Sequence, residues 1–211
     1  MFSLISRLDR RLRKKRVLAS FASVGANFIF DPHSSFVTPE TISIGDNVFI
    51  GEMAHLAGVI AIGSNVMFGP RPVIVAGNHI FAVCGHSVRF LHPRGDENSE
   101  PIYIEDEAWC GACAVILGGV TLGIGSVIGA GSVVTKSIPP YVIAAGNYAR
   151  PMRRIFDDET LHRHLTELGR NESFAADVVD RRTQELAAWR LTELPVTDRT
   201  ADYARVSARQ A

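Results

Sequence analysis

The chain has 211 residues, 46% of them apolar, which suffices for one or two domains with a core and excludes a disordered or fibrous protein. Its 22 lysines and arginines balance 22 aspartates and glutamates, so the charge gives no reason to expect a nucleic-acid partner, and we expect none. Three cysteines, Cys84, Cys110 and Cys113, lack the regular framework of a disulfide-stapled secreted domain, and we expect them to be buried thiols.

The first predicted element is a basic helix over residues 1–20, within an N-terminal segment of residues 1–23. Seven basic residues and one acid, Asp9, stand between Arg7 and Arg16, and apolar residues at helical spacing form a stripe. This helix could cap the fold that follows or touch anionic lipid at the inner membrane face, and the sequence leaves both open. The N-terminus lacks the apolar run of a signal peptide, and no stretch approaches the roughly 20 apolar residues of a membrane span, so we expect a cytoplasmic protein.

A six-residue period follows, and it predicts the fold. Apolar side chains recur at Ile44, Ile50, Leu56, Ile62, Phe68 and Ile74, and again at Ile104, Cys110, Ile116, Leu122, Ile128 and Val134. Two residues before each of these apolar residues stands a residue that is usually small or β-branched, and the residue directly after each is often glycine. Because side chains alternate along a strand, both apolar positions share one face, which favours short strands with a corner every six residues and excludes a helix. Three strands per coil close a triangular prism, and the stacked coils bury a continuous core.

The period breaks after Ile74. Further steps of six reach His86, His92 and Asn98. Polar residues cannot line an apolar core, so residues 80–101 are predicted to form a loop that leaves the coil, and long loops on a rigid scaffold are usually functional. The loop begins directly after Asn78 and His79, so we expect the His79 side chain to point outward at its root.

The last predicted elements are two helices in a C-terminal extension of residues 151–195. Acidic residues at 157–159 suit the first turn of a helix, and leucines at 161, 165 and 168 give this helix one apolar face. A second helix is expected from about 174 to 194, where Pro195 ends it. Residues 196–211 are polar and are predicted to form a flexible tail.

Several segments between residues 101 and 154 resemble the hexapeptide-repeat acyltransferases, among them the maltose, galactoside and capsular-polysaccharide O-acetyltransferases. The segments are IEDEAW at 104–109, GGVTLG at 118–123, VIGAGSVVTK at 127–136, IPP at 138–140 and AGN at 145–147. The resemblance extends back to about residue 25 and is weaker there. As a whole, this resemblance implies a left-handed parallel β-helix over residues 24–150, a reaction that uses acetyl-CoA, and active sites between the subunits of a homotrimer.

One histidine carries the predicted chemistry. No Gly-x-Ser-x-Gly motif is present, and Cys110 occupies an inward position where a thiol is unreactive, so a covalent acyl-enzyme has no candidate nucleophile. A thioester is already an activated acyl donor, so one base that removes the proton of the acceptor would suffice, and histidine suits that task near neutral pH. The resemblance matches the catalytic histidine of the family to His79.

The resemblance also assigns the residues that would hold acetyl-CoA. It matches the backbone at Ala112 and Ala130 to the pantetheine arm, and Thr135, Lys136, Arg150 and Arg153 to the region of the nucleotide phosphates. The residue types agree with this, because a lysine and two arginines at one end of a solenoid suit an anion. Trp109 is expected to face outward, where a CoA arm or a neighbouring subunit could cover it.

The expected acceptor is a hydroxyl of a carbohydrate, free or lipid-linked. Polar side chains on the 80–101 loop suit a hydroxyl-rich ligand, because a site built to pair hydroxyls rejects analogues that lack them. We therefore expect Asn78, His86 and Arg89 to contact the acceptor. Glu52 joins them because it stands near the position at which the galactoside enzyme carries an acceptor-binding asparagine.

Two other functions stay open at this point. The same base could acetylate the amine of an amino sugar or an antibiotic, and a non-catalytic scaffold could keep the repeat for assembly alone. Retention of His79 and of the basic set counts against the scaffold. The three-histidine zinc site of trimeric β-helix carbonic anhydrases has two histidines five apart in one chain. No pair among His79, His86 and His92 has that spacing, so we expect no metal.

Overall fold

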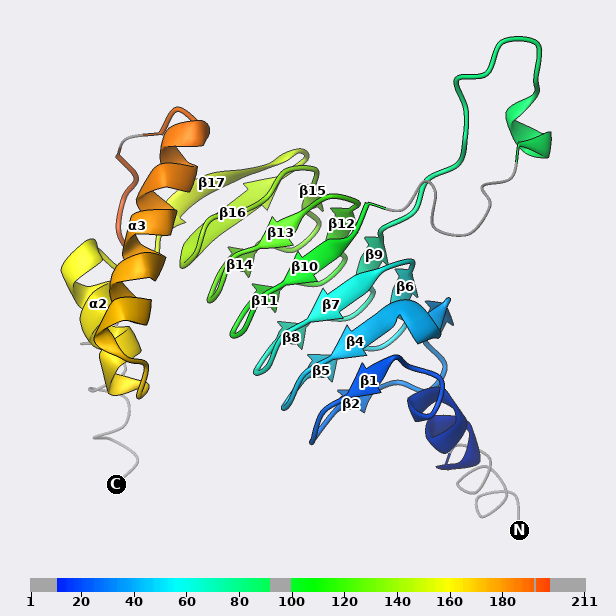
Figure 1. Cartoon of the computed structure of the whole chain (residues 1–211), viewed down its shortest axis with the longest axis horizontal. Helices are drawn as coiled ribbons and strands as arrows, with labels where there is room; N and C mark the ends of the chain where they lie inside the picture. Colours follow the sequence, from blue (N-terminus) through cyan, green and yellow to red (C-terminus); the bar gives the residue numbers. More distant parts are fainter. Residues whose placement is uncertain (1–10, 92–99, 192, 198–211) are drawn as a thin grey trace.

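The computed structural model describes residues 11–91, 100–191 and 193–197, and it is a left-handed parallel β-helix followed by two helices (Figure 1). Three flat sheets form the sides of the prism. Sheet A contains β1 (Ser23–Val24), β4 (Ile42–Ile44), β7 (Ile60–Ile62), β10 (Ile102–Ile104) and β13 (Thr121–Leu122). Sheet B contains β2 (Ile29–Phe30), β5 (Phe49–Ile50), β8 (Met67–Phe68), β11 (Trp109–Cys110), β14 (Val127–Ile128), β16 (Val142–Gly146) and β17 (Ala149–Arg154). Sheet C contains β3 (Ser35–Val37), β6 (His55–Ala57), β9 (Val73–Val75), β12 (Val115–Leu117) and β15 (Val133–Val134).

Equivalent positions of the period stack directly above one another. In sheet A, Ile44 pairs with Ile62, and Ile62 pairs in turn with Ile104. The second of these pairs joins the coil before the long loop to the coil after it, so the loop is an insertion between two neighbouring coils and leaves their register unchanged. The six-residue spacing predicts this stacking, because each coil repeats the same three strands and corners.

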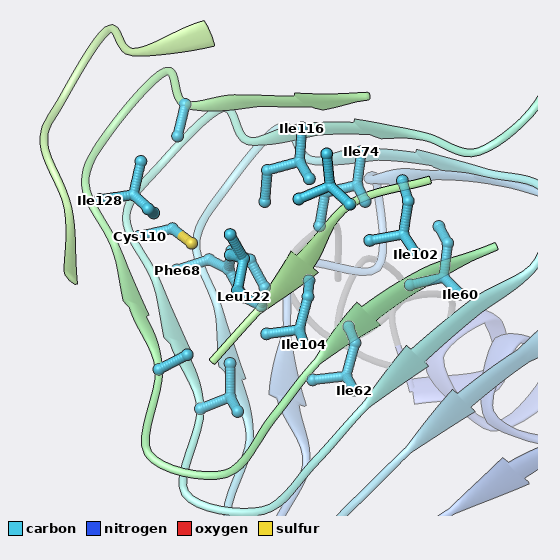
Figure 2. Close-up of a cluster of buried hydrophobic side chains, with 14 of the residues drawn as sticks. Ile60, Ile62, Phe68, Ile74, Ile102, Ile104, Cys110, Ile116, Leu122 and Ile128 are labelled. Carbon is cyan, nitrogen blue, oxygen red and sulfur yellow. The ribbon is translucent and has the colours of Figure 1, made fainter. Parts of the chain in front are cut away.

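The core is a column of apolar side chains inside the prism, as Figure 2 shows for its central coils. All twelve residues of the two predicted runs are at most 4% exposed, which confirms the predicted inner face. Cys110 is among them, and burial raises the pKa of its thiol, in keeping with an unreactive group. The prediction was wrong for Cys84 and Cys113, which are exposed. Cys84 lies on the loop, and Cys113 lies at a corner with φ of 59°, beyond the inward-facing positions.

The described part of the N-terminal segment caps the first coil. Residues 11–18 are helical, and Val17 and Leu18 pack against the core. Arg13 donates a hydrogen bond of 2.7 Å from Nε to the carbonyl oxygen of Pro32. The short helix η1 (Pro39–Thr41) lies between β3 and β4. Residues 1–10, which carry most of the predicted apolar stripe, lie outside the described residues, and no helix in the described ranges is long and apolar enough to cross a membrane.

The C-terminal helices are α2 (Asp158–Glu167) and α3 (Glu172–Ala188). Asp157 caps α2 by accepting a hydrogen bond of 2.7 Å from the backbone N–H of Thr160, and this bond lowers the pKa of Asp157. The predicted start of α2 is therefore confirmed. The predicted end of α3 near residue 194 is wrong, because Arg190 takes a left-handed conformation that closes the helix six residues earlier than expected, at Ala188.

The end of the solenoid also differs from prediction. The β16–β17 pair is an antiparallel hairpin that extends sheet B to Arg154, past the boundary expected at residue 150. Val196 and Thr197, predicted to begin a flexible tail, instead lie against Arg154, whose carbonyl oxygen accepts a hydrogen bond from Thr197 N–H. The free edge of β17 supplies the backbone groups for this pairing. Residues 198–211 lie outside the described range.

Candidate active site

The long loop leaves and re-enters the solenoid at one corner, where sheet C passes into sheet A. Ala76 N–H still donates to Ala57 of the coil below, and Glu100 N–H donates to the Ala76 carbonyl oxygen with a length of 2.8 Å. Glu100 in turn accepts a hydrogen bond of 3.0 Å from Gly119 N–H of the coil above. The two ends of the loop are therefore fixed side by side, although Ala76 and Glu100 lie 24 positions apart in the sequence.

A cleft of about 940 Å³ lies at this corner. It is lined by Val75, Ala76, Gly77, Asn78, His79, Ile80, Phe81, Ala82, Glu100, Leu117, Gly118 and Thr135. His79 is exposed, as predicted, and its backbone N–H donates a hydrogen bond of 2.9 Å to the side-chain oxygen of Asn78. Thr135 follows β15, two coils beyond the coil of His79. The cleft thus brings His79, Asn78 and Thr135 together, and it leaves the imidazole accessible to a ligand.

Glu100 is a lining residue that the sequence analysis did not identify. It supplies a carboxylate to the cleft that also contains His79. Gly118 fits against it closely, since a Cβ added to Gly118 would lie 3.1 Å from the Glu100 Cβ. Its position is the available signal in the sequence, because Glu100 lies two residues before β10, the strand at which the six-residue register returns. A carboxylate in this cleft can accept hydrogen bonds from the hydroxyl groups of a ligand.

The two predicted pantetheine contacts lie at a different corner, where sheet B passes into sheet C. Ala112 accepts a hydrogen bond of 2.8 Å from Gly131 N–H, so Ala112 and Ala130 belong to consecutive coils at the same corner. A Cβ added to Gly111 would lie 2.6 Å from the Ala130 nitrogen, so glycine is needed for the coils to approach this closely. The exposed Arg150 pairs with Ala145 at the top of this corner.

The remaining cofactor candidates are spread over the C-terminal end of the solenoid. Lys136 lines a second cavity of about 550 Å³ together with Ser137 and the C-terminal end of α3. Arg153 is exposed on β17 and pairs with Ile143, and Trp109 is 47% exposed on the same outer face of sheet B. Neither Arg150 nor Arg153 lines the cavity that contains Lys136.

The predicted acceptor contacts are also divided. Asn78 lies in the cleft beside His79, whereas Glu52 lies at the corner between sheets B and C, where its carbonyl oxygen accepts a hydrogen bond from Arg71 N–H. His86 and Arg89 are exposed on the loop, Arg89 within the short helix η2 (Val88–Phe90), and neither lines the cleft of its own chain. His92 lies outside the described residues. Among the residues that are described, no group of three His, Cys, Asp or Glu side chains is placed to hold a metal ion.

Known proteins share both the sequence and the fold of this chain. The family described as the hexapeptide repeat of succinyl-transferase matches residues 101–136. The galactoside O-acetyltransferase of Escherichia coli (strain K12) is 38% identical over 148 residues, which are 69% of this chain and 70% of that protein. The galactoside O-acetyltransferase of Lactococcus lactis is 34% identical over 142 residues, 66% of each chain.

Two solved structures are similar over the same region. A hexapeptide-repeat acetyltransferase of Vibrio cholerae O1 biovar eltor, complexed with acetyl-CoA, superposes with a TM-score of 0.61 at 30% identity, over 71% of this chain and 80% of that one. A galactoside acetyltransferase in complex with CoA superposes with a TM-score of 0.58 at 34% identity, over 70% and 72% of the two chains.

Proposed function

Because this chain belongs to the hexapeptide-repeat acyltransferases and is an acyltransferase, we propose that it transfers an acetyl group from acetyl-CoA to a hydroxyl of a carbohydrate, with His79 as the general base. The observation that carries the proposal is the exposed His79 in an open cleft at the root of the long loop. Histidine is the side chain whose ordinary pKa allows it to accept and return a proton near neutral pH.

The reaction needs no covalent enzyme intermediate. His79 takes the proton of the acceptor hydroxyl, and the oxygen attacks the carbonyl carbon of the thioester. The tetrahedral intermediate then expels the CoA thiolate, which receives the proton from the imidazolium. Asn78 and Thr135 bring an amide and a hydroxyl group to the same cleft, and such groups can donate hydrogen bonds to the oxyanion.

Acetyl-CoA is the proposed donor because two similar structures were solved with acetyl-CoA or CoA. We propose that the pantetheine arm lies along Ala112 and Ala130, and that Thr135, Lys136, Arg150 and Arg153 lie near the phosphates, as the resemblance in sequence implies. Guanidinium and ammonium groups are the usual partners of phosphate in proteins. The chain itself gives no reason to require a metal for this chemistry, since a base and an activated thioester suffice.

We also propose a homotrimer with active sites between subunits. The outer face of sheet B presents a continuous apolar row, in which Ile29, Phe49, Met67 and Trp109 pair in register and are between 42% and 56% exposed. A row of this kind is typical of an interface between proteins. Within one chain, His79 lies at one corner of the prism, whereas Glu52 and Ala112 lie at another. A neighbouring subunit would also bring these separated residues together.

The proposed acceptor is a sugar or polysaccharide precursor, and the alternative is the amine of an amino sugar. Two relatives named galactoside O-acetyltransferases favour the hydroxyl. The cleft adds polar side chains from Asn78, His79 and Glu100, which suit a hydroxyl-rich ligand.

The decisive experiment is a screen of carbohydrate and amine acceptors with the purified protein and acetyl-CoA, following release of free thiol. We expect thiol release that depends on a carbohydrate acceptor and saturates with its concentration. Binding of acetyl-CoA without turnover of any acceptor would favour the scaffold, and the absence of acetyl-CoA binding would overturn the proposal.

A further inference from the structure

The second cavity lies where the solenoid meets the C-terminal helices. Lys136 and Ser137 form its solenoid side, and Glu185, Ala188, Trp189 and Arg190 form its helical side. Its volume is about 550 Å³, within the range of pockets that bind small molecules. None of these four residues, which belong to α3 or directly follow it, falls in the segment that resembles known acyltransferases, so the resemblance leaves this half of the cavity without a role.

Trp189 joins the two sides. Its Nε1 donates a hydrogen bond of 3.2 Å to the Ser137 carbonyl oxygen, and the Lys136 ammonium lies 5.6 Å from the centre of its ring. The second contact is a cation–π interaction, which holds the lysine at the cavity wall. The indole is partly exposed, so it also offers an aromatic surface to a ligand in the cavity.

Arg190 occupies a position at which glycine is favoured. Its φ is 59°, and the backbone closes α3 with hydrogen bonds from Arg190 N–H to Ala187 and from Leu191 N–H to Leu186. These two bonds make a Schellman motif, whose left-handed residue is most often glycine because any other side chain crowds the backbone. An exposed arginine therefore occupies a backbone position that disfavours it, and this residue lines the cavity.

The charges in the cavity suit an anion. Among the described residues, the arginines of α3 that form ion pairs are Arg181 and Arg182, and no carboxylate pairs with Lys136 or Arg190. Glu185 is the acidic lining residue, and its carboxylate lies 3.6 Å from Arg181 Nε. That pairing offsets the negative charge, so two unpaired cations remain beside an aromatic ring.

From this combination we infer that the C-terminal end of α3 completes a site for the nucleotide end of CoA, in which Trp189 contacts the adenine and Arg190, together with Lys136, binds phosphate. Stacking on an aromatic side chain and pairing with guanidinium are the standard means of recognising a base and a phosphate. The new element is the helical half, since Lys136 alone follows from the family match. The inference rests on the proposed function, because it takes acetyl-CoA as the donor.

The location agrees with the length of the cofactor. Lys136 lies at the corner between sheets C and A, the same corner as His79, and two coils beyond it. Neighbouring strands are about 4.8 Å apart, so the two sites are separated by roughly 10 Å along the solenoid axis. A pantetheine arm that runs between the subunits could span that separation, with the acetyl group at His79 and the nucleotide at Trp189.

The test compares Arg190→Gly and Trp189→Ala with the unchanged full-length protein. Arg190→Gly is the sharper variant, because glycine keeps the Schellman backbone while the cation is lost. Affinities for CoA, 3′-dephospho-CoA and adenosine 3′,5′-bisphosphate are measured by isothermal titration calorimetry, with pyrophosphate as a probe for a simple anion site. Arg163→Gln, at an exposed arginine of α2 that does not line the cavity, serves as the matched control.

We expect Arg190→Gly to melt at or above the temperature of the unchanged protein and to bind CoA and adenosine 3′,5′-bisphosphate about tenfold more weakly, the effect of losing one charge-assisted hydrogen bond. Trp189→Ala should weaken the binding of both nucleotides by more than that of pyrophosphate, because the adenine contact is lost for the nucleotides alone. Unchanged nucleotide affinities in a folded Arg190→Gly protein that still binds acetyl-CoA would overturn this inference alone. Failure of the unchanged protein to bind acetyl-CoA would overturn the proposed function instead. If both variants bound the nucleotides and pyrophosphate more weakly by the same factor, the cavity would be a general anion site. That result would also overturn the inference.

Discussion

The Arg181 guanidinium on α3 faces the Glu105 carboxylate of the solenoid with both terminal nitrogens, and Nη1 lies 2.9 Å from Oε1. Glu105 also accepts a hydrogen bond of 2.8 Å from the Ile124 N–H. One carboxylate therefore fixes the corner after β13 and the helix that covers it. Arg170 and Tyr141 reinforce the junction, since Arg170 pairs with Asp106 at 3.1 Å and the Tyr141 hydroxyl donates to Glu107 at 2.6 Å.

We expect Glu105→Ala to destabilise the protein more than Glu105→Gln. The ion pair is partly exposed, so its loss costs only about 1 kcal/mol, whereas an unsatisfied Ile124 N–H adds roughly 1–3 kcal/mol. For a chain of this size, 1 kcal/mol corresponds to roughly 2–4 °C in Tm, which calorimetry resolves. Glu167→Gln, at an exposed position of α2, is the control. Equal melting temperatures for the two Glu105 variants would contradict the role given to the amide bond.

His79→Ala should abolish most turnover while the fold and the affinity for CoA stay unchanged. A general base contributes about 10²–10⁴-fold to rate, and an exposed side chain contributes little to stability. Steady-state kinetics, CoA titration and thermal melting measure the three quantities separately. His33→Ala, at another exposed histidine, should leave all three unaltered. A His79→Ala enzyme with turnover near that of the unchanged protein would mean that another group accepts the proton.

The product of the reaction should be an ester. Mass spectrometry of the acetylated product before and after mild alkali distinguishes the two bonds, because an ester is cleaved and an amide survives. Loss of the added acetyl mass after alkali is the expected result. An alkali-stable product would establish transfer to an amine, the alternative activity of the same base.

Leu122→Ala should destabilise the solenoid strongly, because Leu122 is fully buried within the stack of coils (Figure 2). Removing a buried leucine costs about 2–5 kcal/mol through lost transfer free energy and the cavity that remains. Thr121→Ala, at the outward-facing neighbour in β13, is the matched control and should change stability by less than about 1 kcal/mol. A similar loss in both variants would contradict the strict alternation of the strands.

Glu185→Gln should raise the melting temperature at neutral pH. Burial raises the pKa of Glu185 above its ordinary value of 4.5, the Arg181 guanidinium lowers it in part, and Glu105 raises it further. A raised folded-state pKa means that the ionised form is disfavoured on folding, so this cost is absent below the unfolded pKa and appears as pH rises through the folded pKa. The gain from glutamine should therefore shrink as the pH falls through the raised folded pKa and vanish below about 4.5. Melting curves across this range test the sign, and destabilisation at neutral pH would show that the Arg181 pairing outweighs burial.

The six-residue period by itself determined the coils, the inner face and the place of the long loop. It could do so because each coil contacts only its neighbours, so the same local choice repeats along the chain. The outward position of His79 followed from the same alternation. The exposed cysteines, by contrast, depended on a corner conformation and on the loop, which the period does not describe.

Only the tertiary structure decided which residues meet at a distance. It separated His79 from Ala112 by placing them at different corners of one prism, and it added Glu100 to the cleft. It also set Trp189 against Ser137, 52 residues away, and Arg181 against Glu105, 76 residues away. These contacts arise where a helix docks on the solenoid through individual side chains, and no periodic pattern in the sequence specifies that docking.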